Sequence, residues 1–447
     1  MGDRKMKRRL GGSSQKTKKL RLQESEPKQP PPRKPLASSY IASSSNGLTF
    51  AFYNNHEIIS GSSTISPLFS NEITILSPSI TPSKSSFNQV QSLVGRIKRL
   101  IGTVLRADFS LVPFGSFASS VLWTSKSDLD LSLFLKSPSS FSKTHPSHAL
   151  TLLKSVSSPL KSAFPDLQII ASKNVPILKF TCAKSLINID LSVNSSQGVL
   201  ASCFLKSLFS ICPIGADLAK VIKMWSKSRN LNDPSNGGLS SYALVLLVIS
   251  FLQNFHPKFL PFINEILDED IDSIDGLSSL LFSSVRSGEF ENKCKKFPRV
   301  QVGYTLPELV ALFFIYIFQL NLQKKAISIL SDQCPNRQRY LKRLNSSQTY
   351  RPYVIIIDPL DASNNAARAL SGMGKQLFTS EVERCIAIIN GKSDQSLFNQ
   401  STRFLQRSSY FGSIFDAAEF EQQEDDVFTD TDEDEKVDQD IQLNFQT

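Results

Sequence analysis

The sequence has few of the residues that build zinc sites or disulfide frameworks. It contains six cysteines and four histidines among 447 residues, and no two cysteines have the Cys-x-x-Cys spacing. Neither a zinc site nor a set of disulfides is therefore indicated, and reduced thiols are typical of an intracellular protein. His145 and His148 lie in a stretch rich in serine and proline, without a cysteine or histidine partner at a useful spacing, so we assign them no role.

Long hydrophobic runs are absent as well. The most apolar run, residues 309–318, is shorter than the roughly 20 residues that a membrane-spanning helix needs, and it directly follows Glu308. The N-terminus is positively charged but has no apolar segment behind it, which argues against a secretory signal. Because the longest apolar run is short and no secretory signal is indicated, we expect no membrane partner. No internal repeat and no RNA-recognition-module signature is visible.

Charge is distributed unevenly along the chain. Residues 1–35 hold twelve Lys/Arg and three acidic residues, whereas residues 415–447 hold thirteen acidic residues and one lysine, so the middle carries a net charge of +13. A basic middle suits a polyanionic partner, although a solubilising surface is the alternative. The basic clusters before residue 22 predict either a nuclear-import signal or an RNA-binding arm. We expect the protein in the nucleus, the cytoplasm or both.

Composition and periodicity divide the chain into four parts. Residues 1–80, rich in Lys, Ser and Pro, are expected to be mostly disordered, and the acidic tail at 415–447 likewise. Residues 81–200 alternate between strand and helix patterns, beginning with an amphipathic helix over 88–105. Residues 201–395 are mostly helical, with an elaborated surface connection at 264–300. The predicted class is α+β, with a small mixed sheet followed by a helical domain.

The most informative motif is Gly115-Ser116 followed by Asp128-Leu-Asp130. Successive side chains of a strand point to opposite faces, so Asp128 and Asp130 share one face and the alternating leucines share the other. Two carboxylates on a stiff apolar strand suit a hard cation such as Mg²⁺, which is usually completed by substrate phosphates. The Gly-Ser turn offers backbone N–H groups and a hydroxyl to a phosphate. An amphipathic strand with a solvated polar face is the alternative.

A third carboxylate, Asp190, lies in the strand pattern of residues 186–193, after a second apolar run at 175–180. The three parts, in this order, resemble the DNA polymerase β-like nucleotidyltransferases. The resemblance implies a palm domain in which Asp128, Asp130 and Asp190 bind Mg²⁺ or Mn²⁺ and are the catalytic residues. We assign Asp128 and Asp130 to both metals and Asp190 to the one that activates the attacking hydroxyl.

Further motifs narrow the family. They are Lys223-Met-Trp-Ser-Lys227, Gly238-Leu-Ser-Ser241-Tyr242 and the Asp358-Pro-Leu-Asp361-Ala-Ser-Asn364 segment, which continues to Arg368. Over about residues 85–390 the chain resembles the non-canonical poly(A) polymerases and terminal uridylyltransferases, and within them the plant-type small-RNA uridylyltransferases. The helical part is then a poly(A)-polymerase-associated domain with a base-reading loop at 358–368.

The resemblance implies a set of nucleotide-binding residues. Lys223 and Lys227 are four residues apart and share a helix face, as residues that hold a triphosphate would. Tyr242 would stack on the base, and the loop acids would read it. The whole implied set is Gly115, Ser116, Lys223, Lys227, Ser241, Tyr242, Asp358, Asp361 and Asn364. For the lysines a solvated helix face is the alternative, and for Tyr242 a core position.

Two residues depart from the family pattern. Asn364 stands where yeast-type uridylyltransferases carry a uracil-selecting histidine, and an amide can present a donor or an acceptor. Ala201 stands where some members place an asparagine on the ribose 2′-hydroxyl. Preference for UTP and discrimination against deoxynucleotides are therefore not enforced by these two residues.

The functional hypothesis is template-independent transfer of UMP from UTP to RNA 3′ ends by two metal ions, with release of pyrophosphate. The expected partners are an RNA 3′ end and UTP or ATP. Within the class, the alternative is a non-canonical poly(A) polymerase. From another class, a catalytically silent RNA-binding or scaffold protein of the same fold is possible, although the three carboxylates argue against it. The basic middle disfavours a nucleotidyltransferase that acts on small molecules.

Overall fold

The structure is a computed structural model that describes residues 48–398, apart from short gaps of which the longest are 120–126, 136–144 and 344–351. The basic segment 1–35 and the acidic tail 415–447 lie outside the described residues, and so do the predictions made for them.

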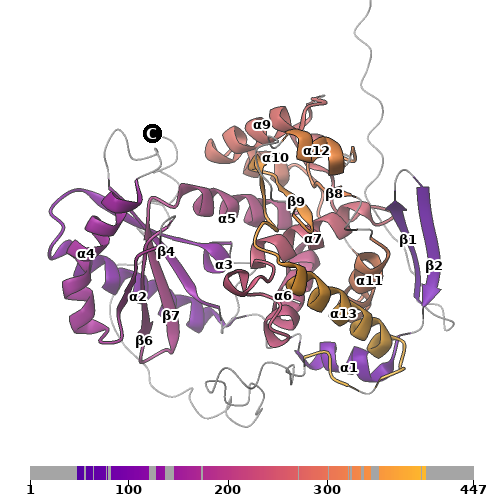
Figure 1. Ribbon diagram of the computed structural model, residues 1–447, viewed down its shortest axis with the longest axis horizontal. Helices are drawn as coiled ribbons and strands as arrows, with labels where there is room; N and C mark the ends of the chain where they lie inside the picture. Colours follow the sequence, from indigo (N-terminus) through magenta and orange to yellow (C-terminus); the bar gives the residue numbers. More distant parts are fainter. Residues whose placement is uncertain are drawn as a thin grey trace, which may run out of the picture. The chain divides into compact units, whose positions relative to one another are not determined.

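A five-stranded sheet carries the motif residues (Figure 1). In spatial order it consists of β3 (Phe109–Phe114), β4 (Leu129–Leu135), β7 (Ile187–Val193), β6 (Ile177–Cys182) and β5 (Gln168–Ile170). β4 and β7 are parallel, and the other neighbours are antiparallel. The sheet is therefore mixed, as predicted.

Helices α2 (Lys84–Gly102) and α4 (Pro146–Ala163) cover one face of this sheet. The leucines of β4, at 129, 131 and 133, are buried against apolar residues of both helices. The helix predicted at 88–105 is confirmed, and it begins earlier because Ser83 caps it by accepting a hydrogen bond from the Ser86 N–H. Since alternate residues point away, the aspartates of β4 lie on the opposite face.

A second, larger core is helical. Its main helices are α5 (Ser196–Phe209), α6 (Pro213–Ser228), α7 (Ser241–Asn254), α11 (Leu306–Gln319) and α13 (Gly372–Ile389). Trp225 of α6 is fully buried, with edge contacts to Phe314 of α11 and Phe378 of α13. Burying an aromatic side chain between three helices fixes α6, and with it the lysines on its other face.

The segment 264–300, predicted to be an elaborated surface connection, is largely helical. It forms α8 (Ile263–Leu267), α9 (Ile274–Arg286) and α10 (Glu289–Lys295). Leu277, Leu281 and Phe290 are buried in the helical core. The connection is therefore more than a surface feature, because its apolar residues pack in the helical core while its acidic and basic residues lie on the exposed faces.

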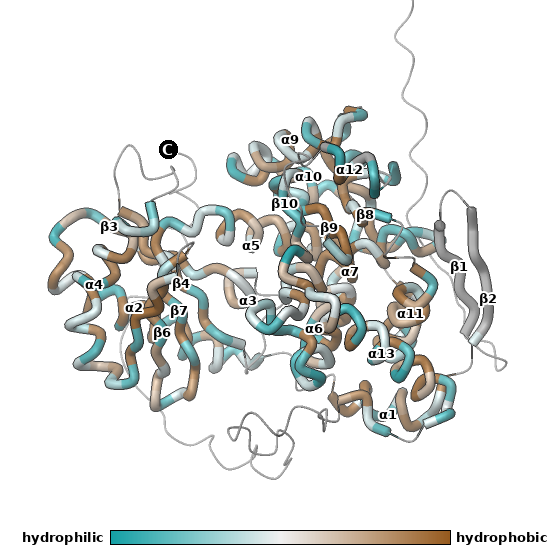
Figure 2. The backbone as a smooth tube through the Cα atoms, viewed as in Figure 1, coloured by the Kyte–Doolittle hydropathy of each residue, from teal (hydrophilic) through white to brown (hydrophobic). Residues whose placement is uncertain are grey.

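A three-stranded sheet forms the last part of the fold. Its strands are β8 (Ala326–Ile327), β9 (Ile355–Asp358) and β10 (Asp361–Asn365), accompanied by α12 (Arg337–Arg343). β9 is apolar along most of its length (Figure 2) and ends at Asp358. The predicted base-reading loop is therefore the β9–β10 turn and the strand after it.

The expected disorder of residues 1–80 is wrong for residues 48–76. These residues form a hairpin of β1 (Leu48–Asn54) and β2 (Glu57–Ser63), followed by α1 (Pro67–Leu76). Phe69, Ile73 and Leu76 recur at helical spacing and are buried in the helical core. These three apolar residues on one helix face pack α1 against the helical core.

The described residues belong to one compact unit with separate cores for the five-stranded sheet and the helices. The division into domains at residue 200 stays a prediction. Among the helices that the structure describes, none combines the length and apolarity that a membrane-spanning segment requires. The five described cysteines have free thiols.

Candidate active site

Asp130 and Asp190 lie side by side on the two parallel strands. The register of β4 and β7 pairs them directly, and Phe114 of β3 is opposite Asp130 on the other side. Oδ1 of Asp190 is shielded from solvent, accepts no hydrogen bond from the described residues and lies 3.7 Å from Lys179 Nζ. The prediction that Asp190 occupies a strand next to Asp130 is confirmed.

The two carboxylates repel each other electrostatically. Burial, followed by the charges of Asp190 and Asp128, raises the pKa of Asp130 to about 7. Burial also raises the pKa of Asp190, although Lys179 opposes the shift. Two paired acids whose pKa values are raised mainly by burial are the environment that a bound cation would stabilise.

Asp128 is not part of the Asp130–Asp190 pair. It lies just before β4, and its Oδ1 accepts a hydrogen bond of 3.1 Å from Asn188 Nδ2. Within the described ranges, no three histidine, cysteine or acidic side chains form a ready-made metal-ligand set. Asp130 and Asp190 are thus the pair that fits a hard cation, and phosphate oxygens of a substrate would have to complete its coordination.

The Gly115-Ser116 turn faces Asp130. Gly115 has a left-handed φ of 70°, and its N–H donates a 2.7 Å hydrogen bond to Oγ of the buried Ser202 on α5. The next residue, Ser116, accepts a 2.6 Å hydrogen bond at Oγ from Lys223 Nζ on α6. The turn thereby brings the hydroxyl of Ser116 and the ammonium of Lys223 to the edge of the carboxylate pair.

Replacing Gly115 by alanine is expected to lower the rate of nucleotide transfer tenfold to a hundredfold. A Cβ at this position would lie 2.2 Å from Asp130 Oδ2, and the positive φ disfavours any side chain by about 1–2 kcal/mol. Gly95→Ala is the matched control, because a Cβ there meets nothing within 4 Å on α2. Equal rates for both variants in a single-turnover assay would show that the turn does not hold Asp130.

The lysines of α6 differ in their surroundings. Lys223 is partly buried, and burial lowers its pKa to about 8 although Asp130 and Asp128 oppose the shift. Lys227 is exposed one turn later on the same side of α6. Ser241 is the first residue of α7, as predicted, and its Oγ accepts a 2.8 Å hydrogen bond from Asn232 Nδ2. A triphosphate beside Ser116 would be within reach of the Lys223 ammonium.

A second group of predicted residues meets at the end of β9. Asp358 Oδ1 accepts hydrogen bonds of 3.1 Å from the Tyr242 hydroxyl and from the Leu360 N–H, and Asp358 Oδ2 accepts one from Asn364 Nδ2. Arg368 donates a 2.8 Å hydrogen bond to Asn364 Oδ1, so both ends of that amide have a partner. Burial raises the pKa of Asp358, against these hydrogen bonds. The structure thus joins Tyr242, Asp358 and Asn364.

Asp361 is turned away from this group. Its Oδ1 accepts hydrogen bonds from the N–H and hydroxyl of Ser363, and the residue lines a cavity of about 290 Å³ against α9. Phe282 and three serines of α9 form the opposite wall of that cavity. Asp358 and Asp361, the two acids predicted to read the base, therefore have different surroundings.

Sequence reasoning missed several residues of the site. Ser202 holds the Gly115 turn, Asn188 holds Asp128, and Lys179 faces Asp190 across the register of β6 and β7. Lys220 of α6 is buried and paired with Asp217 at 3.0 Å, one turn before Lys223. Lys179 and Asn188 could have been found, since both lie on the predicted strands at positions that share the aspartate face.

Comparison with known proteins finds relatives of this chain. Residues 69–209 match the central palm domain of mitochondrial-like poly(A) RNA polymerases. Protein HESO1 of Arabidopsis thaliana is 31% identical over 269 residues, covering 58% of this chain and 51% of that protein. Poly(A) RNA polymerase cid14 of Schizosaccharomyces pombe is 34% identical over 43% of this chain and 27% of its own length. The chain thus spans about half of the first relative and less of the second.

Solved structures share the fold. A structure of the Cid1 poly(U) polymerase with MgGTP bound aligns with a TM-score of 0.60 and 21% identity, over 75% of this chain and 99% of that one. A cytoplasmic RNA terminal U-transferase aligns with a TM-score of 0.59 and 20% identity, over 74% and 98%. The predicted resemblance is confirmed. The chain is thus similar to poly(A) RNA polymerases over the palm domain, and it shares the fold of solved terminal uridylyltransferases.

Proposed function

We propose that this protein transfers nucleotides from NTP to the 3′ end of RNA without a template, and that it uses UTP in preference to ATP. The observation that carries the proposal is the direct pairing of Asp130 and Asp190, beside a Gly-Ser turn that is hydrogen-bonded to Lys223. This arrangement brings acidic metal ligands and triphosphate-binding groups together at one end of the sheet. A catalytically silent scaffold, the alternative, would not need two adjacent carboxylates whose pKa values are raised.

The residues of the site divide the work of an in-line phosphoryl transfer. Mg²⁺ or Mn²⁺ held by Asp130 and Asp190, with Asp128 beside them, would lower the pKa of the attacking 3′-hydroxyl and stabilise charge on the leaving oxygens. Lys223 and the Ser116 hydroxyl bind the triphosphate, and binding of this anion restores the ammonium form of a lysine whose pKa is about 8. Lys227 adds a second charge one helical turn away.

Base choice depends on the group at the end of β9. Tyr242 is held by Asp358, so its ring orientation is fixed before a base stacks on it. Solved structures with this fold include Cid1 with the UTP analogue UMPNPP, which supports UTP as the preferred nucleotide. The alternative, adenosine, is supported by the poly(A) polymerase relatives and by a Cid1 variant with histidine replaced by asparagine, solved with MgATP. Asn364 is therefore the residue whose replacement tests the choice between UTP and ATP.

An extension assay tests the proposed function. Purified protein is incubated with a labelled RNA, Mg²⁺ or Mn²⁺, and each NTP in turn, and the products are resolved on a gel. The proposal predicts stepwise lengthening that is fastest with UTP. Lengthening that is fastest with ATP would establish the poly(A) polymerase alternative, and RNA binding without lengthening under any condition would establish the scaffold.

Replacing Asn364 by histidine is expected to raise the preference for UTP over ATP about ten- to two-hundredfold, since pocket changes of this size move discrimination by about 1–3 kcal/mol. The imidazole is bulkier than the amide and narrows the space that a purine needs. In the wild type the amide bridges Asp358 and Arg368, so the replacement also alters the group that holds Asp358. The measurement is the ratio of kcat/KM for the two nucleotides on one RNA. An unchanged ratio would place Asn364 outside the base pocket.

A further inference from the structure

The outer faces of α2 and α4 carry only positive charge. Neither helix contains an aspartate or glutamate, although together they span 37 residues. Their exposed cations are Lys84, Arg96, Lys98 and Arg99 on α2 and Lys154 and Lys161 on α4. We call Arg96, Lys98, Arg99, Lys154 and Lys161 the basic helical face. A run of cations without an interspersed acid is unlike an ordinary solubilising surface, which mixes both signs.

These cations are not neutralised by neighbours. In the part of the chain that the structure describes, none of the five forms an ion pair. On α10, by contrast, Lys293 and Lys295 pair with Glu289 and Glu291 one turn earlier. Arg96 and Arg99 repel each other at a spacing of three residues, which costs a few tenths of a kcal/mol. A bound polyanion would turn this repulsion into attraction.

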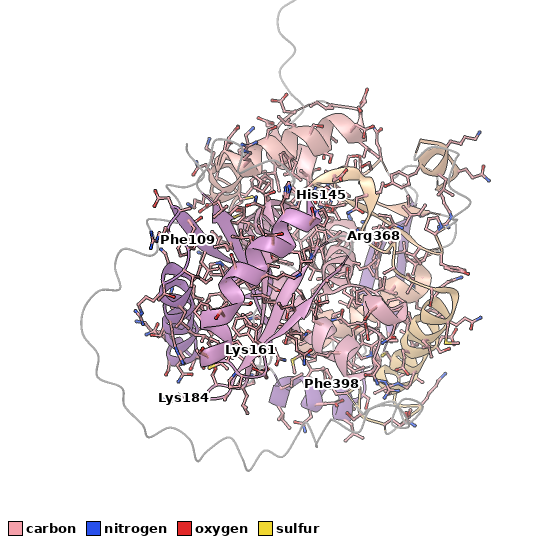
Figure 3. All side chains as sticks on the ribbon, turned by 60° about the vertical axis from the view of Figure 1, so that its left-hand side comes forward. Phe109, His145, Lys161, Lys184, Arg368 and Phe398 are labelled. Atoms are coloured by element: carbon pink, nitrogen blue, oxygen red, sulfur yellow. The ribbon has the colours of Figure 1, made fainter. Side chains whose placement is uncertain are left out.

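The two helices present their cations on the same side of the sheet. α2 and α4 pack on each other through the core beneath them, and the Arg96 guanidinium lies 5.3 Å from the ring centroid of Phe164, which follows α4. Lys154 and Lys161 are seven residues apart and so share one face of α4, with Lys161 near its C-terminal end (Figure 3). Both helices therefore carry cations on the side of the sheet away from the carboxylates, with Arg96 and Arg99 on one flank of α2 and Lys98 on the other.

The basic helical face cannot contact the reacting 3′ terminus. The leucines of β4 point toward α2 and α4, whereas Asp130 points to the other face of the same strand. A sheet and a layer of helices about 10 Å in diameter separate the cations from the carboxylates. An RNA long enough to pass around the edge of the sheet can occupy both sites, and a very short RNA cannot.

We propose that the basic helical face is an RNA-binding surface that holds the phosphate backbone upstream of the 3′ end. The inference rests on the proposed function for its ligand, because an enzyme that extends RNA must hold the rest of the strand. Lysine and arginine without acidic neighbours bind phosphates by charge and not by base identity. The surface should therefore favour long RNA over short RNA while leaving sequence preference unchanged.

The test is a triple variant, Arg99→Gln, Lys154→Gln and Lys161→Gln, which spares Arg96 because that side chain packs on Phe164. The probes are labelled RNAs of about 4 and about 16 nucleotides, which bracket the site sizes of single-strand-binding modules. Fluorescence anisotropy gives Kd at several salt concentrations, and extension assays give KM and kcat. Lys295→Gln is the control, because this exposed lysine is already paired with Glu291.

The proposal predicts at least a tenfold rise in Kd and KM for the long RNA, and no change for the short RNA, for the NTP or in kcat. The salt slope should fall by about 0.7 for each lost phosphate contact, or about 2 in all. Wild-type affinity for the long RNA, or an equal loss for both RNAs, would overturn the proposal and leave the face to an acidic protein. If the wild type extends neither RNA, the proposed function fails, while anisotropy still decides whether this face binds RNA.

Discussion

Replacing Asp130 by asparagine is expected to lower the rate of nucleotide addition by about 10³-fold or more, because the loss of a metal ligand forfeits several kcal/mol of transition-state stabilisation. The fold should not suffer. Asp130 is partly buried beside Asp190, its pKa is raised to about 7, and none of the described residues donates a hydrogen bond to it. Removal of its charge therefore relieves a repulsion. Urea unfolding should show an unchanged or higher free energy of unfolding.

Asp108→Asn is the control for this variant, since Asp108 is an exposed acid at the entrance to the neighbouring strand β3. It should retain wild-type activity and stability. Nucleotide addition by the Asp130 variant at more than a tenth of the wild-type rate would remove Asp130 from the metal site. A large loss of stability would instead show that the residue is structural.

Replacing Glu381 by alanine is expected to destabilise the protein by about 3–5 kcal/mol, because it leaves two nearly buried guanidinium groups without a counter-ion. Arg229, at the end of α6, and Arg384, on α13, both donate to this carboxylate at 2.7–2.8 Å. The exposed fractions of the Arg229 and Glu381 side chains are only 9% and 15%. The pair ties the helix that carries Lys223 to α13, so the measurement is the free energy of unfolding in urea.

Lowering the pH should destabilise the protein in the same way as Glu381→Ala, because it protonates the Glu381 carboxylate. Burial would raise the pKa of Glu381, but hydrogen bonds from the two arginines outweigh it and lower the pKa below its usual value. A lowered folded-state pKa means that the stabilisation is present above the unfolded value of about 4.3 and is lost as pH falls through the folded value. Glu289→Ala, which breaks an exposed pair with Lys293, should cost at most about 1 kcal/mol. Equal losses for both variants would contradict this account.

Local patterns were sufficient to predict the catalytic strands. The alternation of leucine and aspartate over residues 128–133 predicts both a strand and the face that is buried, and the structure confirms each. The similar pattern at 186–193 predicts a neighbouring strand, and β7 is paired with β4 in register. These features follow from two-residue periodicity, which a short stretch of sequence expresses in full.

Long-range contacts were not predictable in the same way. The hydrogen bonds from Gly115 to Ser202 and from Lys223 to Ser116 join residues 87 and 107 positions apart. A single serine in an apolar helix gives no sign of such a partner. Ser202 could have been noticed only as a polar residue at a buried position of α5.

Two glycines lie in the first turn of α13, where a sequence pattern would not predict a helix. α13 begins at Gly372, after Ser371 caps it by accepting a hydrogen bond from the Gly374 N–H. A Cβ on Gly374 would lie 2.0 Å from the carbonyl oxygen of Gly237. The glycine is therefore required by the close approach of two backbones and does not break the helix.

The central claim is that the Asp130–Asp190 pair catalyses attack of an RNA 3′-hydroxyl on an NTP. The most direct measurement is a single-turnover reaction with UTP, Mg²⁺ and two RNAs that differ only in whether the 3′ end carries a hydroxyl or a hydrogen. The account predicts one-nucleotide steps with release of pyrophosphate on the hydroxyl RNA, and no product with the blocked RNA or with the Asp130→Asn variant. Extension of the blocked RNA, or equal extension by the variant, would contradict it.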